Sequence, residues 1–117
     1  MNISRVIPLA VVELVMFALP NGAQGAIILG TNVLLNGHSV TSFADVDENN
    51  QLNSVGFQVS GAAVRDPGSD HVALFLTLPP EAAGTGFRVL QFDWNPHGHE
   101  PLGIYDLPHF DFHFYYI

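Results

Sequence analysis

HFDFHFYYI, residues 109–117, alternates between polar and aromatic side chains from His109 to Phe114. Successive side chains of a β-strand point to opposite faces, so the phenylalanines would line one face and His109, Asp111 and His113 the other. The aromatic face is expected in the core. The opposite face carries potential metal ligands where a small sandwich usually has serine, threonine or lysine. The stretch therefore predicts a strand with a core face and a face of nitrogen and oxygen donors.

The rest of the chain after residue 25 also has the pattern of short strands separated by turns. Clusters of Asn, Gly, Pro and Asp punctuate it, and no helical period extends over ten residues. Residues 79–84 could form one helical turn at most. The strand-like runs are 26–30, 32–35, 38–46, 54–60, 71–78 and 87–94. This pattern predicts an all-β fold, a small antiparallel sandwich or a barrel-like sheet.

Residues 1–25 have the order of a secretory signal peptide. Arg5 gives a short positive segment, residues 6–19 are mostly apolar, and a small-residue tail follows. The apolar run is shorter than the roughly 20 residues of a membrane span. We expect cleavage before Ala26, a mature β domain at 26–117, a secreted or periplasmic location and no membrane attachment after cleavage. An uncleaved anchor or a buried N-terminal helix is the alternative.

Charge and composition exclude several classes of partner. The 117 residues include only 3 basic residues against 11 acidic ones, a net charge of −8. Nucleic-acid binding needs Lys and Arg to neutralise phosphates, so we expect no nucleic-acid partner. Cations suit such a surface. With no cysteine, thiol catalysis and disulfides are excluded, and a small core would gain stability from a metal ion or from homo-oligomers formed through exposed strand edges.

Four of the six histidines lie within the last 22 residues. Alternate residues of a strand stand about 6.6 Å apart, and residues four apart stand about 13 Å apart. One ion should therefore take Asp111 with His109 or His113, and the preceding loop should supply further ligands. The candidate ligands are His97, His99, Glu100, His109, Asp111 and His113. The sequence predicts that these donors converge on one metal ion.

The metal and its role stay open at this stage. Imidazole and carboxylate ligands suit several divalent transition metals, with zinc and iron as the main candidates. A metal-dependent hydrolase or an oxygenase-like enzyme is one alternative, with Glu100 or an unligated Asp111 as general base. A structural or assembly protein is another, in which carboxylates hold the histidines without a metal. A metal-free ligand or catalytic site is the third.

The segment 92–117 closely resembles a bacterial family of exported domains of unknown function, the TTHB-type domain. The shared pattern is W-N-P-x-G-H-E-P followed by I/V-Y-x-x-P-H-F-D-F-H-F-Y, and the resemblance is strongest over residues 70–117. The matching residues include Trp94, Asn95, Pro96, Gly98, His99, Glu100, Pro101, Tyr105, Pro108, His109, Phe110, Asp111, Phe112, His113, Phe114 and Tyr115. The resemblance implies a β-rich exported domain and no established activity. Family members continue past this strand, so we expect a domain that is truncated at its C-terminus.

Overall fold

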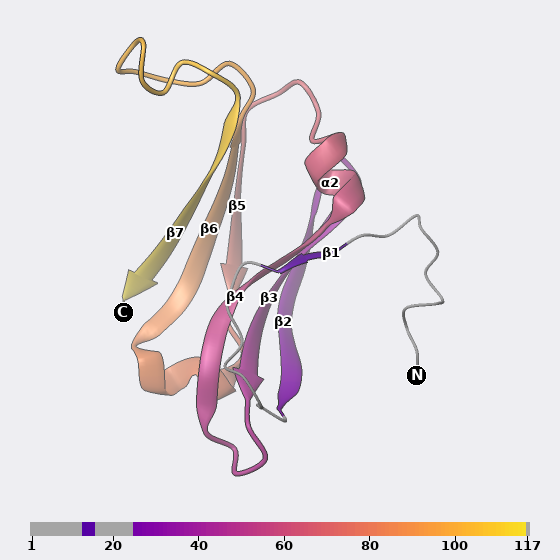
Figure 1. Cartoon of the computed structure of the whole chain (residues 1–117), viewed down its shortest axis with the longest axis vertical. Helices are drawn as coiled ribbons and strands as arrows, with labels where there is room; N and C mark the ends of the chain where they lie inside the picture. Colours follow the sequence, from indigo (N-terminus) through magenta and orange to yellow (C-terminus); the bar gives the residue numbers. More distant parts are fainter. Residues whose placement is uncertain (1–12, 16–24, 117) are drawn as a thin grey trace.

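The computed structural model describes residues 13–15 and 25–116 (Figure 1). The strands in these ranges are β1 Glu13–Val15, β2 Ala26–Leu35, β3 His38–Val46, β4 Leu52–Ser60, β5 Val72–Thr77, β6 Phe87–Asn95 and β7 His109–Tyr116. A short helix α2, Gly61–Arg65, follows β4, and a 3₁₀ helix η1, Pro80–Thr85, precedes β6. The long loop between β6 and β7 projects beyond the ends of these strands (Figure 1).

The strands form two antiparallel sheets. One has the order β1-β4-β3-β2, and the other has the order β5-β6-β7. Both sheets contribute to one buried hydrophobic cluster. The prediction of an all-β antiparallel sandwich is therefore confirmed.

Aromatic rings join the two sheets in the core. Phe57 on β4 is fully buried, and its ring centroid lies 5.5 Å from those of Phe92 and Phe112 and 5.8 Å from that of Phe114. These are edge-to-face or tilted contacts, which aromatic pairs favour. The phenylalanine face of β7 thus packs inward, as the alternation predicts, and its donor face is turned away from this core.

The structure departs from the predicted elements in three places, of which the first is η1: its six residues make about two turns of 3₁₀ helix, where the sequence predicts one helical turn at most. Residues 26–35 form one strand, because an irregularity between Leu29 and Asn32 lets the chain pass Gly30 without ending the pairing. Helix α2 is not predicted, since five residues are too few to show a helical period. Its N-terminus is capped by Ser60, whose hydroxyl accepts a hydrogen bond from the Ala63 N–H at 3.1 Å.

At the N-terminus, β1 pairs with β4, and Glu13 lies opposite Ser60. Most of the predicted signal peptide lies outside the described residues, so its cleavage and the export of the chain stay predictions. No helix within 13–15 and 25–116 has the length and apolar character needed to cross a membrane.

Candidate metal centre

The pairing of β6 with β7 gathers polar residues on the face opposite the core. In the antiparallel register, aromatic residues of β7 lie opposite aromatic or apolar residues of β6, and polar residues lie opposite polar residues. The polar cross-strand pairs are Gln91–His113, Asp93–Asp111 and Asn95–His109. Side chains directly opposite each other on one face have neighbouring Cβ atoms. The donor face predicted for β7 thus continues onto β6.

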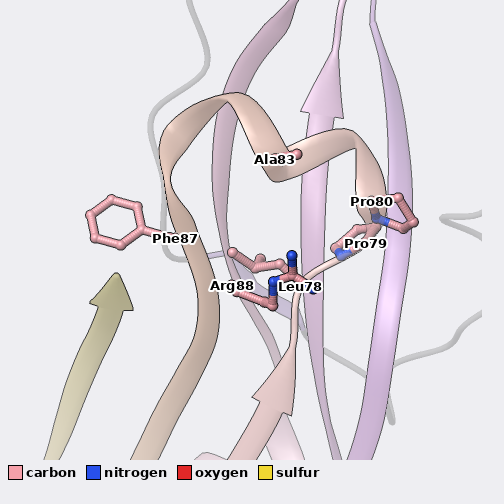
Figure 2. A pocket seen from close by; sticks show the side chains of 6 residues that line it. All are labelled: Leu78, Pro79, Pro80, Ala83, Phe87 and Arg88. Carbon is pink, nitrogen blue, oxygen red and sulfur yellow. The ribbon is translucent and has the colours of Figure 1, made fainter. Parts of the chain in front are cut away.

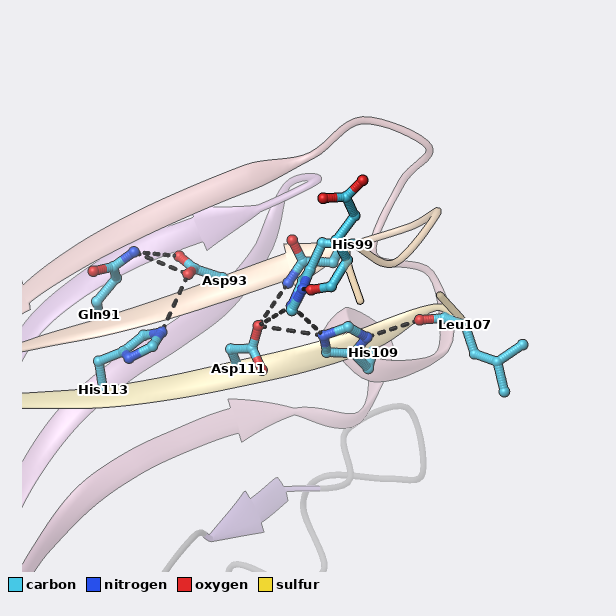
Figure 3. Close-up of polar contacts among 9 residues, drawn as sticks. Gln91, Asp93, His99, Leu107, His109, Asp111 and His113 are labelled. Atoms are coloured by element: carbon cyan, nitrogen blue, oxygen red, sulfur yellow. Dashed lines mark hydrogen bonds and ion pairs between the residues drawn. The ribbon is translucent and has the colours of Figure 1, made fainter. Parts of the chain in front are cut away.

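Three donor atoms converge where this face meets the β6–β7 loop (Figure 3). The Nε2 atoms of His99 and His109 are 3.0 Å apart, and each lies 3.3 Å from Oδ2 of Asp111. His109 and Asp111 come from β7, and His99 comes from the loop. The sequence predicts that Asp111 lies beside one histidine of its own strand and one ligand from the loop, and the structure has this arrangement.

Backbone carbonyls fix the tautomer of both imidazoles. His99 donates from Nδ1 to the Glu100 carbonyl at 2.8 Å, and His109 donates from Nδ1 to the Leu107 carbonyl at 2.7 Å. A carbonyl can only accept, so the proton of each neutral ring is on Nδ1. Both Nε2 lone pairs therefore face the centre of the group. Histidines that bind metals are usually held in this way by their other nitrogen.

The three converging atoms have the spacing that a transition metal requires. Ligands at 2.0–2.1 Å from a tetrahedral ion are about 3.3 Å apart, and octahedral neighbours are about 2.9 Å apart. The observed separations of 3.0, 3.3 and 3.3 Å fall in this range. Asn95 donates from Nδ2 to Oδ2 of Asp111 at 3.0 Å and holds the carboxylate in place. The residues present fit a divalent ion bound by two imidazoles and one carboxylate.

The group remains accessible to solvent. The side chains of His99, His109 and Asp111 are 44%, 24% and 35% exposed. Three protein ligands with solvent access leave coordination positions for water or another small molecule, whereas structural zinc sites are closed by four protein ligands. The arrangement can therefore bind a metal and still present it to a ligand.

The turn before His99 depends on glycine. Gly98 has φ +70°, and a Cβ atom at this residue would lie 2.3 Å from the Tyr105 carbonyl oxygen. The His99 N–H donates to that same carbonyl at 2.6 Å. A side chain at residue 98 would thus have both an unfavourable backbone conformation and no space. Close packing of the loop upon itself fixes the position of His99.

Protonation of His99 is favoured by its surroundings. The hydrogen bond from Nδ1–H to the Glu100 carbonyl raises the pKa of His99 above its ordinary value of 6.5, and the Asp111 carboxylate adds to this increase. Desolvation acts in the opposite direction and is outweighed. The same negative environment that attracts a proton at Nε2 would attract a metal cation.

A second group lies beside the first along β7. Ligand atoms of Asp93, Asp111 and His113 all lie within 4.8 Å of one another, and Nε2 of His113 is 3.5 Å from Oδ2 of Asp93. Gln91 donates from Nε2 to both Asp93 oxygens, at 2.8 and 2.9 Å (Figure 3). The predicted ligand His113 therefore lies in this group, apart from His109.

The other two predicted ligands have different positions. His97 and the side chain of Glu100 are exposed and belong to neither three-residue group of the described chain. Glu100 contributes through its backbone carbonyl, which accepts from His99. Sequence reasoning missed Asp93 and Asn95. Their signal was the alternation Gln91, Asp93, Asn95 within a strand, which places all three on one face.

A separate pocket lies under η1, at the other end of the smaller sheet (Figure 2). Its lining is mainly apolar and includes none of the histidines or aspartates described above. The residues that line it are Leu78, Pro79, Pro80, Ala83, Phe87 and Arg88. The candidate centre is thus a surface site on the donor face and is not part of this pocket.

Comparisons with protein-family models, curated proteins and solved structures found no match. The resemblance to TTHB-type domains therefore stays a prediction from the sequence.

Proposed function

We propose that this chain is an exported β domain that binds a divalent transition metal through His99, His109 and Asp111. The observation that carries the proposal is the pair of Nε2 atoms, 3.0 Å apart with both Nδ1 protons already donated to carbonyls. Two lone pairs at this distance repel each other unless a metal ion or a proton lies between them. Asp111, at 3.3 Å from each, completes a ligand set for that cation.

A metal-free histidine–carboxylate network is the main alternative. A single added proton on one imidazole would give one hydrogen bond between the rings. It would leave the other Nε2 as an acceptor and would not account for the similar distances from both rings to Oδ2 of Asp111. One metal ion serves all three atoms at once. This difference favours the metal over the proton.

Zinc and iron are the two metals that fit the ligand set best. Two histidines, one carboxylate and water form a tetrahedral zinc site of the open type. The same three protein ligands on one face of an octahedron form the arrangement of non-haem iron oxygenases. We expect zinc to occupy the site under aerobic purification, because its tetrahedral ligand spacing of about 3.3 Å matches two of the three observed separations.

The open coordination positions favour one further candidate, a metal-dependent enzyme. A bound zinc ion lowers the pKa of its water to about 7 and so supplies a nucleophile for ester or phosphoester hydrolysis. His99 would be essential as a ligand in such an enzyme. Turnover of a generic ester or phosphoester by the wild type, lost in His99→Ala, would support it, and equal turnover by the two proteins would exclude a role for this centre.

Metal content tests the proposed binding directly. The full chain is purified without a histidine tag, stripped with a chelator and dialysed against a zinc buffer. Outer-shell partners alone change metal affinity about 10–100-fold, so loss of a direct ligand in His99→Ala or His109→Ala should weaken binding by at least about 100-fold. His97→Ala is the matched control, because His97 is an exposed loop histidine outside both groups.

Circular dichroism establishes that each variant keeps its β structure. Wild-type affinity retained in both His99→Ala and His109→Ala would contradict the proposal, and so would an equal loss in His97→Ala. Export, which follows from the predicted signal peptide and the TTHB-type resemblance, is tested separately by fractionation of cells that express the full chain.

A further inference from the structure

The two three-residue groups share a carboxylate. Asp111 belongs to the set with His99 and His109 and also to the set with Asp93 and His113. Its contacts with Asn95, His99 and His109 all use Oδ2. One oxygen of Asp111 also lies within 4.8 Å of ligand atoms of Asp93 and His113, so the same carboxylate could serve a second ion. A carboxylate that offers one oxygen to each of two ions is the usual bridge of a two-metal site, in which the ions are about 3.5–4 Å apart.

We propose that Asp93, His113 and the Asp111 carboxylate hold a second divalent transition metal ion, so that the centre is dinuclear. The proposal rests on the metal binding proposed above and extends it. It assigns a role to Asp93, which the first ion does not use, and to His113, whose imidazole lies 3.5 Å from the Asp93 carboxylate.

The charges on the donor face supply the first argument. Asp93 and Asp111 lie directly opposite each other on neighbouring strands, and like charges in that position are destabilising. The Asp93 side chain is only 12% exposed, so water screens its charge poorly. A cation between the two carboxylates removes the repulsion and replaces it with attraction to both.

The positioning of Asp93 supplies the second argument. Gln91 donates to both of its oxygens, and the Gln91 carbonyl oxygen in turn accepts from the Tyr115 hydroxyl. Asn95 holds Asp111 in the same manner for the first ion. Each carboxylate thus has its own amide donor, the type of outer-shell support that orients metal ligands. His113 is the cross-strand neighbour of Gln91, and its imidazole lies beside the Asp93 carboxylate.

Zinc stoichiometry of the full chain tests the second site. Calorimetric titration of metal-free wild type should show about two zinc ions bound per chain. Asp93→Asn and His113→Gln should each bind about one, because the first ion keeps His99 and His109. Asp106→Asn and His97→Gln are the matched controls, because both residues are exposed in the β6–β7 loop and belong to neither three-residue group, and they should bind as the wild type does.

Manganese provides a second, spectroscopic measurement. Two Mn²⁺ ions that share a carboxylate give an exchange-coupled electron paramagnetic resonance signal, and isolated ions do not. The wild type with two equivalents of Mn²⁺ should give the coupled signal, and Asp93→Asn should give that of isolated ions.

The outcomes separate this inference from the proposed function. A single zinc ion in the wild type, lost in His99→Gln and unchanged in Asp93→Asn, would overturn the second site and leave the first. No bound zinc, or binding that is unaffected by His99→Gln, would overturn both. Two ions without magnetic coupling would overturn the shared carboxylate.

Discussion

Asp93 on β6 and Asp111 on β7 form a direct cross-strand pair of two carboxylates. Amide donors from Gln91 and Asn95 serve one member each, and histidines flank the pair on both sides along β7. Neutral donors reduce the repulsion without cancelling it, because the two negative charges still face each other. This relationship connects the two donor groups, which could hold metal ions.

Asn95 should tune the affinity of the first ion without being a ligand. Its side chain is buried and donates to Oδ2 of Asp111 at 3.0 Å. We predict that Asn95→Ala weakens zinc binding about 10–100-fold, the usual effect of removing an outer-shell partner. Asn95→Asp should also weaken zinc binding, because a carboxylate cannot donate a hydrogen bond to Asp111. Zinc affinity measured by competition with a chelator checks both, and an unchanged affinity in Asn95→Ala would show that Asp111 needs no such support.

The pH dependence should have opposite signs with and without metal. The folded-state pKa of His99 is raised above 6.5 by the Glu100 carbonyl and then by Asp111. In the metal-free protein, the stabilisation from His99 is therefore complete below the unfolded pKa and is lost as the pH rises through the folded pKa. A metal must displace that proton, so zinc affinity should increase as the pH rises through the same range.

Urea unfolding and zinc titration between about pH 5.5 and 8.5 measure these two trends. The titratable groups next to the imidazole of His99 are His109, Asp111 and Tyr105. His99→Gln should flatten the trend of metal-free stability over this range. A zinc affinity that does not change with pH would contradict the assignment of His99 as a ligand.

Gly98 should be required for the centre and not for the fold. Gly98→Ala places a Cβ atom 2.3 Å from the Tyr105 carbonyl oxygen at a positive φ, and the loop must shift to accept it. We predict a loss of zinc affinity of more than tenfold with unchanged β-sheet circular dichroism. Gly103→Ala is the matched control, since Gly103 also has a positive φ, +81°, with open space around its Cβ position. Equal losses in both variants would mean that backbone strain alone is responsible.

Phe57 should be the most costly core position to truncate. It contacts aromatic rings of both β6 and β7, so Phe57→Ala should lower the free energy of unfolding by about 3–5 kcal/mol. Phe75→Ala should cost far less, because Phe75 is an exposed phenylalanine of β5. Urea denaturation of both variants measures the difference. Similar decreases in the free energy of unfolding for the two variants would contradict the central position of Phe57 in the core.

The sequence was sufficient for features that depend on local alternation. His109 to Phe114 alternate with period two, so their division into a core face and a donor face follows from strand geometry alone. The turn at Asn36 and Gly37 is also local: φ values of 51° and 82° fit the type I′ hairpin that an Asn-Gly pair favours.

Features that depend on pairing or loop packing could not be predicted in the same way. Asp93 and Asp111 meet because of the register between β6 and β7, which the sequence of neither strand specifies alone. His97 and His99 have the same side chain and neighbouring positions, yet only His99 reaches Asp111, because the turn at Gly98 and the hydrogen bond to Tyr105 set the direction of the loop. Composition does not distinguish two such histidines.

The alternation along β7 ties the chemistry of this protein to the accuracy of its folding. Displacing this strand by a single residue would turn phenylalanines to the solvent and bury His109, Asp111 and His113, so all the ligands that β7 supplies would be lost in one error. The proposed metal binding would therefore report on the register of β7, since only molecules with the correct strand alignment would present these ligands together.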